Sequence, residues 1–160
     1  AIETSIAPVT TQPIAPTYTG KAFKSEKERA QAAVTEFETI ANNYSGEIRD
    51  KAKYFAAVNR ISLDRNAAVA ELETLSKTGG EVGALSKFAL AQAKQGDGKF
   101  DEAVALYQEL ISANNSIVPK DSINFALASI YEKQGKKAEA ADIYFKIADA
   151  ASKAKDTEGK

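Results

Sequence analysis

Residues 127–144 read LASIYEKQGKKAEAADIY, and residues 90–107 repeat the same layout as LAQAKQGDGKFDEAVALY. In both stretches the alanine of a Leu-Ala pair precedes a second alanine, Ala140 or Ala103, by 12 residues, and a tyrosine follows four residues later. A looser copy of the layout contains Ala68 as its second alanine. Because turn-forming residues separate the two halves of each copy, the layout predicts a pair of helices that is repeated along the chain.

The second alanine of each copy recurs at a nearly constant period. Counted from Ala33, successive alanines are 35, 35 and 37 residues apart, and each has a large apolar or aromatic residue four and seven positions later. Small residues on facing helices let two backbones approach, and one helical pair cannot bury its apolar side without a neighbour. We therefore predict an all-α, right-handed helical-hairpin solenoid of about seven helices. The residues predicted to pack the repeats are Ala33, Phe37, Phe55, Ala56, Ala68, Leu72, Leu90, Ala91, Ala103, Tyr107, Leu127, Ala128, Ala140 and Tyr144.

Capping and turn signals set the expected helix ends. Ser25 and Glu28 form the capping box S-x-x-E before the first helix, Gly46 can supply a left-handed cap after it, and Asp101 is expected to cap the fifth helix. The expected helices span 25–44, 47–61, 65–77, 82–95, 100–113, 120–134 and 137–152. They make up a repeat domain over 21–155, between an extended Pro/Thr-rich linker at 1–20 and a disordered tail at 156–160.

The repeat resembles the tetratricopeptide repeat signature. The resemblance rests on the pattern L-A-x2-Y-x3-G-x4-A-x3-Y, formed by Leu127, Ala128, Tyr131, Gly135, Ala140 and Tyr144. The copy at 90–107 departs at Lys94, where tyrosine is usual, and the first copy has Asn59 and Leu63 in place of the usual tyrosine and glycine. The resemblance covers about residues 24–152 and implies three repeats that follow one lone helix.

The order of linker, long first helix and degenerate repeats is similar to that of bacterial membrane-anchored periplasmic tetratricopeptide-like proteins, above all the ancillary subunits of the SecYEG translocon. This resemblance implies a domain on the periplasmic side of a bacterial inner membrane, tethered through a missing upstream segment. It further implies a scaffold that assists the translocation or assembly of envelope proteins.

The family resemblance also implies where a partner binds. Tetratricopeptide-like proteins hold a peptide or a partner helix in the concave face, which is lined by the first helix of each pair. The residues expected there are Lys53, Ala57, Arg60, Phe88, Gln92, Gln95, Phe125, Ser129 and Glu132. Ala57 and Ala89 stand where a carboxylate clamp has asparagines, so we expect an apolar or amphipathic ligand instead. The alternatives are core packing for Phe88 and Phe125, and a solvated helix face for Lys53 and Arg60.

Composition narrows the classes of function. The 160 residues carry 21 Lys plus Arg and 22 Asp plus Glu, a net charge of −1, and contain neither histidine nor cysteine. This excludes His- or Cys-based catalysis and thiol redox chemistry, and it argues against zinc, haem or iron–sulfur ligation and against nucleic-acid binding. We expect no catalytic residue, no metal and no cofactor, and a protein or peptide as partner. The carboxylates of Glu36, Glu38, Glu71 and Glu73 are expected on the solvent face.

Two other functions remain open from the sequence. The first helix could pair with a second copy, which would make the chain a structural homo-oligomerisation domain. Alternatively, the chain could be an accessory domain of an enzyme whose catalytic part is absent.

Overall fold

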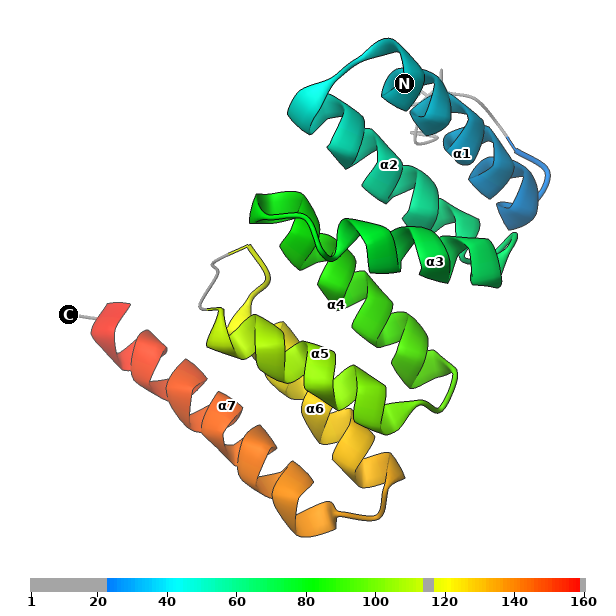
Figure 1. Ribbon diagram of the computed structural model, residues 1–160. Coiled ribbons are helices and arrows are strands. Elements are labelled where there is room, and N and C mark those ends of the chain that lie inside the picture. Colours follow the sequence, from blue (N-terminus) through cyan, green and yellow to red (C-terminus); the bar gives the residue numbers. More distant parts are fainter. Residues whose placement is uncertain (1–22, 114–116, 159–160) are drawn as a thin grey trace, which may run out of the picture.

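The computed structural model describes residues 23–113 and 117–158, and these residues form seven helices with no strand (Figure 1). The helices are α1 (Glu26–Asn43), α2 (Gly46–Arg60), α3 (Arg65–Leu75), α4 (Gly80–Gly96), α5 (Phe100–Ser112), α6 (Lys120–Lys133) and α7 (Lys137–Glu158). The predicted all-helical fold is confirmed. The linker expected at 1–20 lies outside the described residues, and α7 runs past the domain boundary expected at 155.

Glycines end the first helix of the two best-formed repeats. Gly98 and Gly135 have φ angles of 74° and 76°, a left-handed conformation that glycine adopts without steric cost. In each turn the amide after the glycine donates to the carbonyl five residues earlier, at 2.9 and 2.8 Å. This bond satisfies a carbonyl that the end of the helix would otherwise leave unpaired. The two turns therefore reverse the chain in the same way.

The structure confirms the other expected helix caps only in part. The Ser25 hydroxyl accepts from the amide of Glu28 at 3.1 Å, as the capping box predicts, but the Glu28 carboxylate accepts from the amide of Lys24 (2.8 Å) rather than from that of Ser25. Gly46 has the expected positive φ of 63°, yet it begins α2 instead of ending α1. The cap of α5 is Lys99, and Asp101 lies in the first turn of that helix.

The first helix is not alone. α1 runs antiparallel to α2 and packs on it more extensively than any other two described helices pack together (Figure 1). The further antiparallel pairs are α4–α5 and α6–α7, whereas α3 crosses between α2 and α4. The resemblance implies a lone α1 and a hairpin of α2 and α3; in the structure α2 packs on α3 as expected, but α1 also packs on α2. The reason lies in α1, where Ala30 and Val34 are buried and the Phe37 ring stacks on Phe55 at 5.2 Å.

Burial follows the predicted repeat except in the first pair. Ala68, Ala103 and Ala140 are all fully buried or nearly so, as close packing of small residues requires. Ala33 is only half-buried, because α1 turns the face of Ala30 and Val34 inward. Phe55 is 44% exposed, although its counterparts on α4 and α6 are buried leucines. The first unit therefore keeps the period of the repeat but not its packing.

Two apolar clusters hold the helices together. The larger joins α4, α5 and α6 and consists of Ala91, Ala103, Tyr107, Leu110, Val118, Ile123, Leu127 and Ile130. The smaller joins α2, α3 and α4 and consists of Ala57, Leu72, Ala89 and Leu90. Because each cluster uses side chains from three successive segments, neighbouring helical pairs share their apolar packing.

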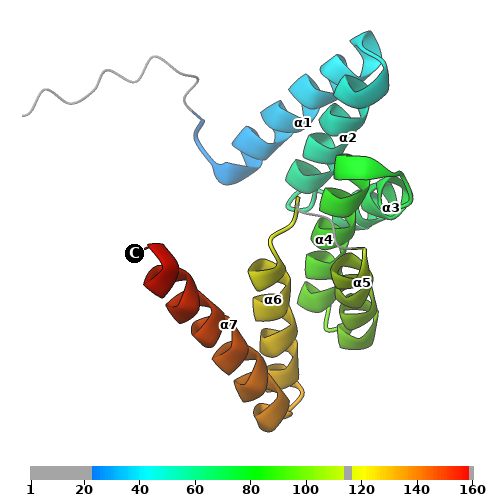
Figure 2. The ribbon, with the colours of Figure 1, turned by 90° about the vertical axis from the view of Figure 1, so that its left-hand side faces the viewer.

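The contacts between helices show how the array is arranged. Among the described helices, α2 contacts α4 and α4 contacts α6, whereas α3 and α5 do not contact each other and neither do α5 and α7. The helices α2, α4 and α6 therefore form a continuous row. Figure 2 shows the resulting arc, with α1 and α7 on the same side of this row and α3 and α5 on the other.

The ion pairs of Lys94 explain why a lysine stands where the repeat pattern has a tyrosine. Its ammonium lies 3.0 Å from the Glu73 carboxylate on α3 and 2.9 Å from the Glu102 carboxylate on α5, and the side chain is 11% exposed. The hydrogen bonds, that of Glu102 first, raise the pKa of Lys94. A charged residue here thus ties α4 to the helices on both sides, in place of the usual tyrosine.

None of the helices in the described ranges is both long enough and apolar enough to span a bilayer.

Candidate functional site

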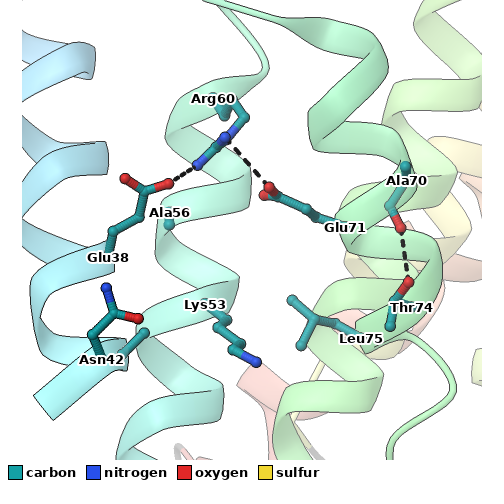
Figure 3. A pocket seen from close by; sticks show the side chains of 10 residues that line it. Glu38, Asn42, Lys53, Ala56, Arg60, Ala70, Glu71, Thr74 and Leu75 are labelled. Carbon is teal, nitrogen blue, oxygen red and sulfur yellow. Dashed lines mark hydrogen bonds and ion pairs between the residues drawn. The ribbon is translucent and has the colours of Figure 1, made fainter. Parts of the chain in front are cut away.

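A groove lies over α2, between α1 and α3 (Figure 3). Its volume is about 740 Å³, and its walls combine charged, amide and aliphatic side chains. It is lined by Glu38, Ala41, Asn42, Lys53, Ala56, Arg60, Ala70, Glu71, Thr74 and Leu75. The groove exists because α3 leaves α2 at a steep angle, while α1 stays alongside it.

Arg60 closes one end of the groove. Its guanidinium forms ion pairs with Glu38 on α1 and with Glu71 on α3, the latter at 3.4 Å (Figure 3). Burial raises the pKa of Glu71, and the positive charge of Arg60 opposes that shift. The guanidinium Nε is buried with no hydrogen-bond partner among the described residues. With both terminal nitrogens engaged, Arg60 fixes the spacing of the two walls instead of offering a free charge.

Lys53 and Asn42 are the polar side chains that the groove leaves available. Lys53 is exposed, and within the described ranges its ammonium has no carboxylate partner. Asn42 lies on the α1 side of the Lys53 side chain, whose ammonium points toward the side of Leu75 (Figure 3). The Thr74 hydroxyl, by contrast, already donates to the carbonyl of Ala70 at 3.0 Å. Together with Ala41 and Ala70, which are half-buried and exposed, respectively, these groups offer one cation, one amide and a small apolar patch.

Two residues predicted on the concave face of α4 contact a tyrosine of α5. The Phe88 ring lies edge-on to the Tyr107 ring, with centroids 5.7 Å apart, and the Tyr107 hydroxyl donates to Gln95 Oε1 at 3.2 Å. Tyr107 is fully buried, and burial raises its pKa to about 12. We call this arrangement, in which the two residues of one helix hold a tyrosine of the next, a tyrosine clasp.

The same clasp recurs in the last pair. The Phe125 ring lies 5.7 Å from the Tyr144 ring, and the Tyr144 hydroxyl donates to the Glu132 carboxylate at 3.1 Å. Burial and this hydrogen bond raise the pKa of Tyr144. The spacing of the three residues equals that of the first clasp, Phe-x6-Gln-x11-Tyr. Four predicted site residues therefore hold helical pairs together, and their contact with a partner stays a prediction.

The remaining predicted residues are scattered. Gln95 Nε2 donates to the Ser129 hydroxyl at 3.5 Å, which links α4 to α6. Gln92 is exposed. Ala57, expected to face a ligand, is fully buried against α3 and α4. The structure thus brings Lys53 and Arg60 together in one groove and places the others elsewhere.

The sequence reasoning missed the acidic wall of the groove. Glu38 is exposed, as expected, and Glu71 is half-buried, but the sequence did not predict that both pair with Arg60. A usable signal was present for Glu71, because it precedes Leu72, a predicted packing residue, and so had to lie at the rim of the core. No such signal marks Glu38, since its pairing depends on how α1 sits beside α2.

Within the part of the chain that the structure describes, no three side chains of His, Cys, Asp or Glu come together in a way that could hold a metal ion.

A family model described as tetratricopeptide repeat matches residues 88–155. The matched stretch begins within α4 and covers both pairs that carry a tyrosine clasp. No curated protein and no solved structure matches the chain. Tetratricopeptide repeats suggest protein–protein interaction modules with protein partners. Over residues 88–155 the chain is therefore similar to the tetratricopeptide repeat family.

Proposed function

We propose that the chain is a non-catalytic protein-interaction module that binds a peptide segment of its partner in the groove between α1, α2 and α3. The observation that carries this proposal is Lys53, which lines the groove without a carboxylate partner among the described residues while nearby Arg60 is neutralised by two. The volume of about 740 Å³ lies within the range of established ligand sites.

The groove selects for a particular peptide chemistry. An acidic side chain or a carboxyl terminus would pair with Lys53, and an aliphatic side chain would cover Ala41 and Ala70, which are half-buried and exposed, respectively. The ion pair is exposed to solvent and contributes about 0.2–1 kcal/mol, and the apolar surface is small. We therefore expect weak binding that salt reduces only slightly.

The proposal extends to location. The order of linker, long first helix and degenerate repeats supports a role as the extracytoplasmic domain of a membrane-tethered protein. There it would assist the translocation or assembly of bacterial envelope proteins. This extension is independent of the groove and has its own test.

Photo-cross-linking tests the groove. A photoreactive amino acid in place of Asn42 should form adducts with a partner segment that carries an acidic residue, and the same probe at exposed Ala105 on α5 should not. Lys53→Glu should reduce the adducts several-fold because repulsion replaces the ion pair, whereas Lys53→Arg should keep them because the charge remains. Equal adducts from both positions, or adducts that Lys53→Glu leaves undiminished, would contradict the proposal.

Protease treatment of spheroplasts tests the location. Full-length protein on the outer side of the inner membrane should be digested without lysis. Protection until the membrane is broken would place the domain in the cytoplasm and refute the extension alone.

A further inference from the structure

The outer face of α7 carries an uncovered stripe. Ala141, Phe145, Ala148 and Ser152 follow one another at spacings of four, three and four, which places them on one side of the helix. All four are exposed, and Phe145, at 71%, is the most exposed large apolar side chain of the described residues. α7 contacts only α6 among the described helices and lies at the edge of the array (Figure 1). We call these four residues the α7 stripe.

The equivalent stripe of α5 is covered only in part. It lies 37 residues earlier and contains Val104, Gln108 and Ile111. Val104 and Ile111 are partly buried against the cluster that joins α5 to α4 and α6, whereas Gln108 is exposed. The apolar positions of this face of α5 therefore lie at the edge of the packing with the neighbouring helices.

α3 repeats the arrangement. Its stripe, a further 35 residues earlier, contains Val69 and Glu73. Val69 packs on the cluster that includes Leu90 of α4, and the Glu73 carboxylate is 3.0 Å from the Lys94 ammonium of α4. In both earlier cases the apolar residues of this face thus pack at the edge of a cluster that includes the following helix.

The two covering helices share a pattern of buried residues. In each, a buried leucine follows a buried residue by four positions and precedes another by three. These residues are Ser86, Leu90 and Ala93 in α4, and Ile123, Leu127 and Ile130 in α6. The covering helices have 17 and 14 residues. The chain therefore shows twice what kind of helix fits this face.

We propose that the α7 stripe is a docking surface for an amphipathic helix of a partner protein. This helix carries a small or aliphatic residue, a leucine four positions later, and another small or aliphatic residue three positions after the leucine. The contact would continue the seams between α3 and α4 and between α5 and α6. Phe145 takes the place of Glu73, so the partner should carry an apolar or aromatic side chain where α4 has Lys94.

A second copy of the chain does not supply such a helix. The pattern residues of α4 and α6 are already buried within their own molecule. The α7 stripe is also separate from the groove of the proposed function, which lies among α1, α2 and α3. Either surface can therefore fail its test without the other.

A helical peptide can stand in for the partner. We suggest a fluorescein-labelled peptide of residues 118–134, the sequence of α6, held helical by a side-chain lactam on its exposed face because so short a helix is marginal in water. Fluorescence anisotropy should show saturable binding to the chain. Phe145→Glu should weaken it at least tenfold, and Ile48→Glu, a matched change at an exposed residue of α2, should not. A peptide with Leu127→Glu should not bind.

Several results would overturn the proposal. The first is the absence of saturable binding, and the second is equal binding by the wild type and Phe145→Glu. Ala148→Glu gives an independent check, and circular dichroism confirms that each variant keeps its helices. Light scattering that reveals a dimer of the wild type, lost in Phe145→Glu, would assign the stripe to a second copy instead.

Discussion

Tyr107 makes the free energy of unfolding depend on pH in the alkaline range. Burial raises its pKa from 10 to about 12, because the phenolate would lose its hydration inside the core. The unfolded chain therefore releases this proton first as the pH rises. The contribution of the protonated Tyr107 to the free energy of unfolding is complete below pH 10 and is lost between pH 10 and 12, at about 1.4 kcal/mol per pH unit. Over these two pH units the free energy of unfolding falls by about 3 kcal/mol.

Tyr107→Phe isolates this contribution. At pH 8 the variant should lose about 1 kcal/mol, the usual net value of a hydrogen bond such as the one to Gln95. Between pH 9 and 11 the advantage of the wild type should shrink by about 1 kcal/mol, because only the wild type carries the buried phenol. Urea unfolding followed by circular dichroism measures both, and Tyr44→Phe, at a side chain 57% exposed, is the matched control. A pH profile of Tyr107→Phe parallel to that of the wild type would refute the reasoning.

Three further substitutions test the packing by thermal and urea unfolding. Gly83→Ala should cost about 1–3 kcal/mol or more, because the new Cβ would lie 1.8 Å from a carbonyl oxygen of the preceding loop, and Gly79→Ser, with open space around it, should change little. Ala103→Leu should cost about 1–3 kcal/mol by overfilling a fully buried site, whereas Ala105→Leu at an exposed site should be tolerated. Ser86→Ala should be neutral or stabilising, because its buried hydroxyl has no partner among the described residues, and a loss above about 1 kcal/mol would contradict this.

Local signals explain how much of the fold could be predicted. Helix existence follows from periodic apolar residues, and helix ends follow from Ser25, Gly98 and Gly135, whose effects act over a few residues. These signals predicted seven helices with ends close to those observed, except that α7 runs to Glu158 instead of ending at 152. They misplaced the cap of α5, since several polar residues near a helix start compete for that position.

The candidate site was harder to predict. Some of the residues expected on a concave face here contact tyrosines of the next helix, as Phe88 and Gln95 contact Tyr107. The spacing Phe-x6-Gln-x11-Tyr was visible in the sequence, but whether a side chain points to a neighbouring helix or to a ligand depends on how the helices rotate against each other. That rotation is decided by the whole interface.

The sequence by itself determined the helices, their turns and the period of the repeat, because each depends on interactions between residues close along the chain. Only the tertiary structure decided that α1 pairs with α2, that Arg60 joins Glu38 to Glu71, and that a groove opens between them. These features depend on how whole helices settle against one another. Small differences in packing, such as the stacking of Phe37 on Phe55, decide among partners that the sequence pattern leaves equivalent.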